Sequence, residues 1–480
     1  MSRLSRRTVL KVAAASSVFP LFTISGTKAS ARVIGANDTI RVAIAGINGR
    51  GTAHIDGFAG AKNVEVAYLV DPDTRIYANR TKLVEAKGGN TPKCIQDVRQ
   101  ALDDKTIDAI SIATPNHWHS LMTIWGCQAG KDVYVEKPIS HNVFEGRQCV
   151  KAAEKYGRIV QHGTQNRSSQ GKANEIAAVH SGKYGELLVS KGYCCKPRWS
   201  IGTKGPGTPP ENFDYNLWLG PAAEMPYHGN LVHYNWHWFW ATGNGDIGNQ
   251  GVHEMDIARW AIKDATLPTS VMSMGIRALP DGEKDQGETP NMQLSVMEFG
   301  KVLLVFEVRG LVGKNKDYPQ QVANEYYTTE GVIKGGKFYP KDGSEPQELK
   351  SDYSIKVAPG GPFGSFLNAM RTRNPAEVNC NAEVAHYSSA LCHLSNVSQR
   401  LGTLESIDKA RAAVANIDSA KEALAKLEAN GAAVGAKLEQ LSVGPKLTFD
   451  PASEKFVDAP EADKLLTRNY REGFVVPTEV

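Results

Sequence analysis

Residues 39–51 read TIRVAIAGINGRG. The run from Thr39 to Ala45 consists mostly of β-branched and small apolar residues, which is typical of a buried parallel strand. A glycine-rich turn begins directly at Gly46, and the residues after it predict a helix from Ala53 to Phe58. A strand, a glycine turn and a helix in this order predict the first unit of a doubly wound α/β domain.

Three further apolar runs predict parallel strands in the same domain, with helical segments between them. They cover residues 64–70, 107–113 and 132–135. The residues that follow them are Asp71, Thr114-Pro115-Asn116 and Glu136-Lys137-Pro138. We therefore predict a dinucleotide-binding Rossmann domain over residues 38–162.

The pattern changes at about residue 163, where hairpin-like turns replace regular helices between the strands. Strands are predicted at 187–193, 270–277, 294–299, 302–309 and 325–329, and helices at 246–262, 363–370 and 383–401. The predicted fold class is thus α/β, with a Rossmann parallel sheet followed by a C-terminal α+β domain (163–402) around a large, mostly antiparallel open sheet. Residues 403–480 are expected to form a helical and irregular extension, with helices over 410–439 broken near Gly431 and a tail that wraps the surface.

The composition is that of a soluble globular enzyme, with 41% hydrophobic and 22% charged residues among 480. The formal charge of +4 comes from the N-terminus, because residues 1–31 hold five basic residues and no acid. The rest of the chain has 50 basic and 51 acidic residues, so charge gives no reason to bind nucleic acid or an anionic membrane. No apolar run after the N-terminus is long enough for a membrane span. Seven irregularly spaced cysteines without a Cys-x-x-Cys pair argue against a disulfide framework and a zinc knuckle.

Residues 1–31 are predicted to be an export signal. Ser5-Arg6-Arg7-Thr8-Val9-Leu10-Lys11 precedes a weakly apolar run, and Ala29-Ser30-Ala31 has the pattern of a cleavage site. Paired arginines before a modest apolar run resemble the twin-arginine signal, so the expected export partner is the twin-arginine translocase. We expect a periplasmic or secreted protein, anchored if the signal is retained; a general secretory signal is the alternative.

The glycine turn predicts a dinucleotide site, because it exposes backbone N–H groups at the start of a helix. Gly46 and Gly51 occupy the first and third glycine positions of the fingerprint, whereas Asn48 stands at the second. Asp71 follows Gly46 by 25 residues, where a carboxylate accepts hydrogen bonds from ribose hydroxyls and repels a 2′-phosphate. We expect NAD rather than NADP, which Arg75 leaves open. A Rossmann domain without nucleotide is the alternative.

Together these elements resemble the Gfo/Idh/MocA oxidoreductase family, which includes glucose–fructose oxidoreductase and inositol dehydrogenase. The resemblance rests on the loop 46–51, on Thr114-Pro115-Asn116 and most specifically on Glu136-Lys137-Pro138 at a strand end. Trp218-Leu219-Gly220-Pro221 and residues 245–253, GDIGNQGVH, are similar to a secreted bacterial branch of that family.

The resemblance implies an NAD(P) site at the carboxyl edge of the Rossmann sheet and a homo-oligomer formed through the open sheet. The predicted cofactor residues are Gly46, Asn48, Gly49, Arg50, Gly51, Asp71, Thr114, Asn116, His119, Glu136, Lys137 and Gln165.

The resemblance also implies catalytic roles. Lys137 corresponds to the family's active-site lysine, and His253 and Asp256 fall in its Asp-x-Gly-x-His-x-x-Asp segment. Asn249 replaces the first aspartate of that segment, and an amide can orient a hydroxyl but cannot take its proton. We expect Lys137, with a lowered pKa, and His253, titrating near neutrality, to carry the proton between them. An exposed strand-end lysine and a core histidine are the alternatives.

Substrate residues are expected in loops of the second domain. Residues 233–240, HYNWHWFW, hold rings that can pack on the C–H faces of a sugar, although alternate residues of a strand there would fill the core. The predicted substrate residues are Arg167, Trp236, His237, Asn249 and Asp256. The spacing His233-x-x-x-His237 and the carboxylates of Glu254 and Asp256 suit a metal, but no further ligand cluster accompanies them and none is expected.

The expected activity is oxidation or reduction at a secondary alcohol of a sugar, glycoside or cyclitol. Since no free nicotinamide pool is expected outside the cytoplasm, the NAD is expected to be tightly held and recycled within the protein. A redox-neutral NAD-dependent glycosidase fits the same residues. A non-catalytic sugar-binding module is the third alternative.

Overall fold

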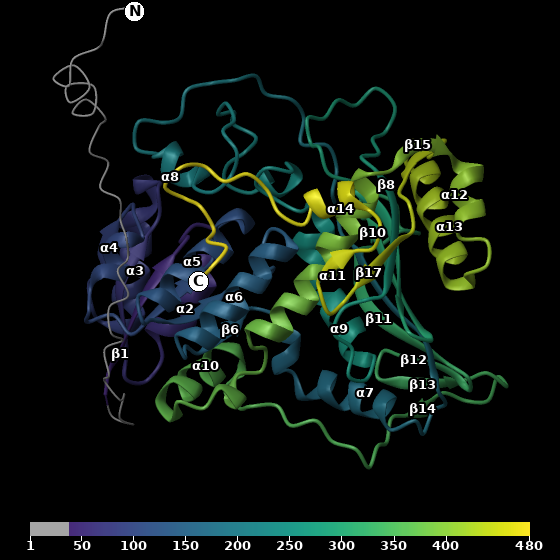
Figure 1. Ribbon diagram of the computed structural model, residues 1–480, viewed down its shortest axis with the longest axis horizontal. Coiled ribbons are helices and arrows are strands. Elements are labelled where there is room, and N and C mark those ends of the chain that lie inside the picture. The colour runs from purple at the N-terminus through teal and green to yellow at the C-terminus, as the bar shows by residue number, and fades with distance from the viewer. Residues whose placement is uncertain (1–37) are drawn as a thin grey trace, which may run out of the picture.

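The computed structural model of the protein describes residues 38–480. A six-stranded sheet lies in the N-terminal part and a twelve-stranded sheet in the C-terminal part, so the molecule has two halves (Figure 1). The predicted export signal lies outside the described residues. Within residues 38–480, no helix is both long enough and apolar enough to cross a membrane.

The six-stranded sheet has the order β3-β2-β1-β4-β5-β6, and every neighbouring pair is parallel. This is the doubly wound order, in which the connections change direction between β1 and β4 and leave a crevice at the carboxyl edge. The strands are β1 (Ile40–Ala45), β2 (Val64–Val70), β3 (Lys93–Ile95), β4 (Ala109–Ile112), β5 (Asp132–Val135) and β6 (Val160–His162).

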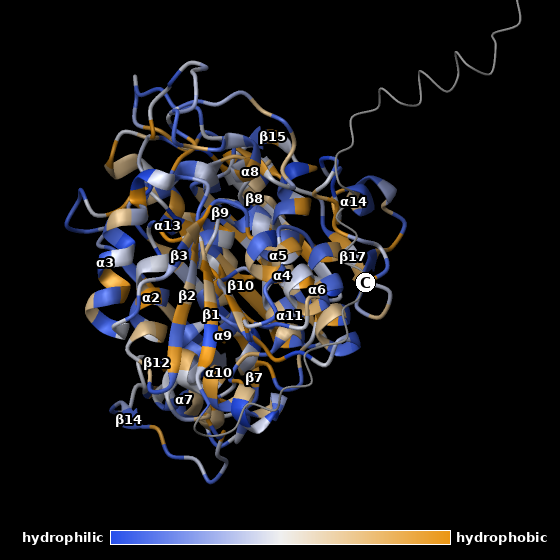
Figure 2. Cartoon of the chain, turned by 90° about the vertical axis from the view of Figure 1, so that its left-hand side faces the viewer, coloured by the Kyte–Doolittle hydropathy of each residue, from blue (hydrophilic) through white to orange (hydrophobic). Residues whose placement is uncertain are grey.

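Helices cover both faces of this sheet. One face packs on α4 (Arg99–Asp103), α5 (Asn116–Gln128) and α6 (Val143–Lys155), and the other on α2 (Gly51–Ala59), α3 (Tyr77–Gly88) and α10 (Gly361–Thr372). Figure 2 shows β1 and β2 as hydrophobic strands inside, with hydrophilic helix residues outside. The predicted Rossmann sheet is confirmed.

The twelve-stranded sheet is mostly antiparallel, with one parallel pair, β7 and β10. Its main path runs β14-β13-β12-β11-β7-β10-β9-β8-β16-β15, and β17 and β18 extend it beside β8. The strands are β7 (Leu187–Cys195), β8 (Ser270–Ile276), β9 (Met292–Phe299), β10 (Val302–Arg309), β11 (Gln321–Thr328), β12 (Gly331–Lys334), β13 (Lys337–Pro340), β14 (Gln347–Glu348), β15 (Thr403–Ser406), β16 (Gln440–Val443), β17 (Leu447–Asp450) and β18 (Lys455–Phe456). The large, mostly antiparallel sheet that we predicted is confirmed.

Helices also lie on both sides of the large sheet. The side toward the Rossmann domain packs on α9 (Val252–Ala261) and α11 (Ala382–Arg400), and the far side of β8–β10 packs on α12 (Ile407–Ala413) and α13 (Asp418–Ala433) (Figure 1). The helices α7 (Gln170–His180), α8 (Tyr215–Leu219) and α14 (Pro460–Lys464) complete the fold. The helices α12 and α13 cover part of the open sheet, which reduces the surface that it could offer to another subunit. Oligomerisation through that sheet stays a prediction.

Three local predictions differ from the structure. Residues 233–240 are not a strand but turns and a 3-10 helix, η3 (Asn235–Trp238), because their rings pack among loop aromatics and no neighbouring strand pairs with them. The helix α13 does not break at Gly431, which instead lets the chain turn back closely, since a Cβ there would lie 2.4 Å from the carbonyl oxygen of Ala436. Residues 403–480 add strands to the sheet as well as helices.

Candidate active site and cofactor cavity

One cavity of about 410 Å³ lies at the carboxyl edge of the Rossmann sheet, between the two halves of the chain. Its volume falls within the usual range for ligand and cofactor sites. Every predicted cofactor residue except Gly51 lines it, and so do all three predicted catalytic residues. The predicted residues on its wall are Gly46, Asn48, Gly49, Arg50, Asp71, Thr114, Asn116, His119, Glu136, Lys137, Gln165, Trp236, Asn249 and His253.

The glycine turn between β1 and α2 packs tightly against the end of β4. Gly46 has a φ of +79°, and a Cβ there would lie 2.6 Å from the carbonyl carbon of Ala113, so only glycine fits. Gly51 starts α2 behind the cavity, where a Cβ would lie 2.0 Å from the carbonyl oxygen of Gly46. Arg80 on α3 donates to the carbonyl oxygens of two loop residues at 2.6 and 3.2 Å and so fixes the turn.

Asp71 follows the last residue of β2 and lines the cavity. The backbone N–H groups of Ile47 and Asp73 donate to its two carboxylate oxygens, each at 3.0 Å. Burial raises the pKa of Asp71 to about 6, although these two donors favour the charged form. A carboxylate held in this way is a fixed acceptor, which suits the ribose hydroxyls of a dinucleotide.

His119 joins the two loops that follow β4 and β5. Its ring nitrogens lie 2.6 Å from the carbonyl oxygen of Pro138 and 2.8 Å from that of Thr114. The buried hydroxyl of Thr114 has no hydrogen-bond partner among the described residues, so it is available to a molecule in the cavity. Asn116 begins α5 and donates to the side chain of Asn244 at 3.3 Å, which links this edge to the second half.

Glu136 is the centre of a buried polar cluster beside the glycine turn. One carboxylate oxygen lies 2.7 Å from Nε of Arg50 and 3.2 Å from Nε2 of both Gln165 and His54. Burial opposes ionisation, but the hydrogen bond with His54 and the charges of Arg50 and Lys137 outweigh it and hold the pKa of Glu136 below its usual value. Glu136 is therefore a permanent anion that positions Arg50 and Gln165, not a proton acceptor near neutral pH.

Lys137 lies on the cavity wall, and its Nζ donates to the backbone carbonyl oxygen of Asn249. Burial lowers the pKa of Lys137, against the carboxylates of Glu136 and Asp246, which favour the charged form. A lysine with a lowered pKa exchanges protons more readily near neutral pH than an exposed one.

Asn249 lies in a π-helical turn, η4 (Ile247–Gly251), which leads into α9. Such turns are rare and occur frequently at functional sites. In this turn the peptide oxygen of Asn249 accepts from Lys137, and the side chain at this position is an amide. Lys137 thus has a peptide oxygen, not a carboxylate, as its hydrogen-bond partner here.

His253 faces the cavity from the first turn of α9. Burial, together with the positive charge of Lys137, lowers the pKa of His253 to about 3. Our expectation that it titrates near neutrality is therefore wrong, because both causes penalise the imidazolium. Within residues 38–480, no protein group hydrogen-bonds to its ring, so a neutral imidazole is available to a ligand.

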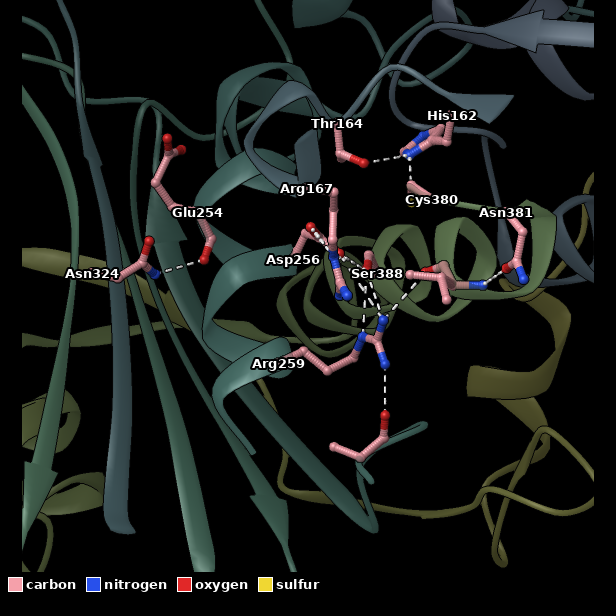
Figure 3. Close-up of polar contacts among 12 residues, drawn as sticks. His162, Thr164, Arg167, Glu254, Asp256, Arg259, Asn324, Cys380, Asn381 and Ser388 are labelled. Carbon is pink, nitrogen blue, oxygen red and sulfur yellow. Dashed lines mark hydrogen bonds and ion pairs between the residues drawn. The ribbon is translucent and has the colours of Figure 1, made fainter. Parts of the chain in front are cut away.

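Arg167 and Asp256, two predicted substrate residues, do not line the cavity. The guanidinium of Arg167 donates twice to the carboxylate of Asp256, both times at 2.9 Å, and the hydroxyl of Ser388 donates to the same carboxylate at 2.5 Å (Figure 3). The same carboxylate also lies 4.0 Å from the guanidinium of Arg259. This buried pair joins the segment after β6 to α9 and α11, so the structure gives both residues a bracing position and no contact with a cavity ligand.

His237, the third such residue, is also separated from the cavity. It is fully buried, and its Nδ1 lies 2.7 Å from the carbonyl oxygen of Tyr234. Trp236 and Tyr234, one and three residues earlier, do line the cavity. His233 pairs with Asp73 at 2.8 Å, not with His237, so the spacing that suited a metal does not bring the two rings to a shared ligand position.

The structure adds wall residues that we did not predict. Lys196, Arg198, Gln250 and Tyr234 line the side toward the second half, and Trp118 and Trp218 lie among the remaining wall residues. The alternation of Cys194, Lys196 and Arg198 at the end of a predicted strand was the available signal for two of them.

A segment of the second half, residues 199–241, crosses the end of the cavity beside Asp71 and is here called the strap. Its backbone bonds to the loop after β2, since Thr74 N–H donates to Asn212 (3.0 Å) and Asp214 N–H donates to Pro72 (2.9 Å). The imidazole of His233 reaches Asp73, two residues from Asp71. The strap therefore contacts the part of the Rossmann edge where Asp71 lies.

The C-terminal tail, residues 466–480, holds the strap in place and runs back from α14 toward α8 and α5 (Figure 1). Arg471 donates to the carbonyl oxygens of Asn216 (3.1 Å) and Gly220 (3.2 Å) in the strap. Arg468 donates to the carbonyl oxygen of Ala241 at 3.1 Å. The ring of Phe474 packs at 5.5 Å on Trp118, which lines the cavity.

Both halves of the chain match models of known protein families. Residues 40–164 match the Gfo/Idh/MocA oxidoreductase family, NAD-binding Rossmann fold, and residues 186–431 match the C-terminal alpha/beta domain of that family. A glycosyl hydrolase family 109 protein of Shewanella pealeana is 28% identical over 182 residues, which are 37% of this chain and only 40% of that relative.

Solved structures share the fold at lower identity. The WlbA dehydrogenase from Chromobacterium violaceum, in complex with NADH and UDP-GlcNAcA, has a TM-score of 0.55 and 18% identity, covering 76% of this chain and 95% of its own. The aldose-aldose oxidoreductase from Caulobacter crescentus, complexed with glycerol, has a TM-score of 0.54 and 15% identity, covering 75% and 97%.

Proposed function

The chain belongs to the Gfo/Idh/MocA oxidoreductase family, and from this we propose that it is an NAD-dependent oxidoreductase acting on a secondary alcohol of a sugar, glycoside or cyclitol. One observation carries the proposal: Lys137, Asn249 and His253 line the same cavity as the glycine turn and Asp71. A nucleotide and a hydroxyl-bearing substrate can therefore meet beside Lys137.

The cavity residues fit NAD. The glycine turn leaves backbone uncovered, Asp71 is a fixed acceptor that would repel a 2′-phosphate, and the buried hydroxyl of Thr114 lacks a partner within the described chain. When bound, NAD supplies the acceptor for the hydride that leaves an alcohol carbon. Arg50 and Gln165, both held by Glu136, are the side chains placed beside the glycine turn for its polar groups.

The protein supplies the proton transfer. Lys137 Nζ is placed to take the proton of a substrate hydroxyl, and after protonation it stabilises the charge on that oxygen. Neutral His253 has both ring nitrogens available to hold the same hydroxyl or its neighbour. The side chain of Asn249 orients the substrate without exchanging a proton.

We propose further that the cofactor is retained between turnovers. The strap crosses the nucleotide edge, and Arg468 and Arg471 tie the strap to the tail, so release requires these contacts to open. A nucleotide that stays bound has to be recycled in place, for example by exchange between two sugars. The aldose-aldose oxidoreductase, which shares the fold, is consistent with such an exchange.

A redox-neutral NAD-dependent glycosidase is the second candidate, favoured by the family 109 glycosyl hydrolase that aligns with part of this chain. Transient oxidation at C3 of the sugar would acidify the C2–H bond, and loss of that proton would expel the aglycone from C1. Water would then add at C1 across the new double bond, and return of the hydride to C3 would restore the oxidation state. The same Lys137 would serve the first and last of these steps.

We also propose export by the twin-arginine translocase, followed by a periplasmic or secreted location. Support comes from the pair Arg6-Arg7 before a short apolar run, in the part of the chain that lies outside the described residues. Export of a folded protein suits a cofactor that is already bound. Fusion of residues 1–37 to a reporter, with Arg6 and Arg7 replaced by lysine as the control, tests it.

The test of function uses the purified protein with a panel of sugars and aryl glycosides. An oxidoreductase changes the near-ultraviolet absorbance of its bound nicotinamide when a sugar is added, whereas the glycosidase releases the aglycone with no net change. Lys137→Ala abolishes either signal, with the exposed Lys155→Ala as control. Sugar binding without absorbance change or aglycone release, equal in the wild type and in Lys137→Ala, would instead support a non-catalytic sugar-binding module.

A further inference from the structure

The end of β7 brings two cations to the cavity wall. Cys194, Lys196 and Arg198 alternate along the chain and point to the same side, toward the π-helical turn η4. Their side chains contact that turn and the residue before it: Lys196 Nζ donates to Gln250 at 2.7 Å, and Arg198 Nε donates to Asp246 at 2.7 Å. Both cations line the same cavity as Lys137.

The charges on this wall do not balance. Arg198 has a carboxylate partner, but the partner of Lys196 is the neutral amide of Gln250. Among residues 38–480, no carboxylate lies within ion-pair distance of Lys196 or Lys137. Glu254 accepts from the same amide at 3.2 Å, and burial raises its pKa to about 7. Lys196 is thus a cation on this wall that has a neutral amide as its partner, where Arg198 has a carboxylate.

A half-buried ammonium beside a neutral partner is unfavourable unless a ligand supplies the missing charge. Gln250 directly follows Asn249 and lies three residues before His253, and Lys196 and Lys137 line the same cavity, so one bound molecule can reach both lysines. The second η-nitrogen of Arg198 has no acceptor in the described chain and offers another donor. One unbalanced charge calls for a monoanion, and a carboxylate matches this better than a phosphate dianion.

We propose that the substrate is an acidic sugar, a uronic acid or another sugar carboxylate, whose carboxylate is bound by Lys196 with Arg198 as second donor. This rests on the proposed function and narrows its substrate class. Lys196 thereby determines specificity, while Lys137 and His253 act on the hydroxyl.

The test compares matched pairs that differ only in the acid group: D-glucuronate with D-glucose, and D-galacturonate with D-galactose. Calorimetric affinities for the NAD-loaded protein are measured beside kcat/KM, so that binding is read without turnover. We expect the acid to be favoured about 10- to 100-fold in at least one pair, the usual effect of one charge-assisted hydrogen bond. In Lys196→Met the ratio falls toward one, and in Lys196→Glu it inverts.

Lys314→Met is the matched control, because it removes the same charge from an exposed lysine that stacks on Trp199 outside the cavity. It is expected to keep the wild-type preference. Three outcomes would overturn this inference and leave the oxidoreductase proposal intact. They are equal affinity for acid and neutral sugars, an acid preference that survives in Lys196→Met, and stronger binding of glucose 6-phosphate than of either uronate. Failure of the proposed function would give a different result: sugars would bind without turnover, and Lys137→Ala would leave that binding unchanged.

Discussion

The two walls of the cavity are built in different ways. On the cofactor wall, Asp71, Thr114 and Lys137 each lie one or two residues after the end of a parallel strand. On the substrate wall, Lys196, Trp236 and Asn249 come from a strand extension, a 3-10 turn and a π-helical turn. The first wall follows from the doubly wound topology, whereas the second depends on how irregular segments pack. Changes on the first wall should therefore abolish chemistry or cofactor binding, and changes on the second should alter selectivity.

The largest effect is expected from Lys137→Ala. Loss of the proton-transferring amine lowers kcat by about 100- to 10,000-fold, the usual range for a general base. The glycine turn and Asp71 are untouched, so bound NAD stays at the wild-type level. Steady-state kinetics and nucleotide content measure the two quantities on one preparation. A variant that loses NAD together with activity would show that Lys137 is needed for cofactor binding as well as for proton transfer.

The next largest effect concerns stability. Asp256→Ala leaves the guanidinium of Arg167 buried without its partner, which costs about 3–5 kcal/mol of unfolding free energy. Denaturant unfolding measures it, with the exposed pair partner Asp408→Ala as a control expected to change by less than about 1 kcal/mol. If Asp256→Ala had unchanged stability and a raised KM, Asp256 would be a substrate-binding residue and not a bracing one.

A smaller effect is expected from Arg471→Ala, which removes the hydrogen bonds of Arg471 to the strap and leaves that of Arg468 to Ala241. Release of NAD should quicken about 10-fold, because hydrogen bonds of this kind each contribute about 1 kcal/mol. Exchange of bound NAD against labelled NAD measures it, and the exposed Arg411→Ala is the control. Equal release rates would mean that the contacts of Arg471 with the strap do not limit release of the nucleotide.

The smallest and most specific effect is a pH dependence at Asp71. Its pKa is raised to about 6 in the folded protein, so its contribution to stability is greatest below its unfolded pKa and is lost as pH rises through 6. Affinity for NAD should follow the opposite trend, falling by up to about 10-fold per pH unit below 6, because the ionised form accepts the ribose hydroxyls. Asp71→Asn should flatten both profiles. Parallel trends of stability and affinity would contradict this assignment.

The difference between the walls also explains what could be predicted from the sequence. Strand ends are local features, so the sequence alone is enough to place Asp71 and Lys137 on one edge of the sheet. Arg167 was assigned to the substrate because it follows a predicted strand, and Asp256 because it falls in the family's segment, yet they pair with one another across the chain. Only the packing of α9 on the segment after β6 decides this, and no local pattern encodes it.

The substrate wall shows the same limit at shorter range. The aromatic run 233–240 has a composition common to strands and to packed turns, and only the absence of a neighbouring strand makes it a turn. The low pKa of His253 arises from burial and from Lys137, more than a hundred residues earlier in the chain. The position of Lys196 beyond the end of a predicted strand could be seen in the sequence, but its contact with the neutral amide of Gln250 could not.

The central claim is that the glycine turn and Asp71 form a working, retentive NAD site beside Lys137. The most direct measurement denatures the purified protein and identifies and counts any released nucleotide by mass, for the wild type and for Lys137→Ala. The account predicts close to one NAD or NADH per chain in both. Protein that releases no nucleotide and fails to bind added NAD would contradict it, because the cavity would then not be a cofactor site.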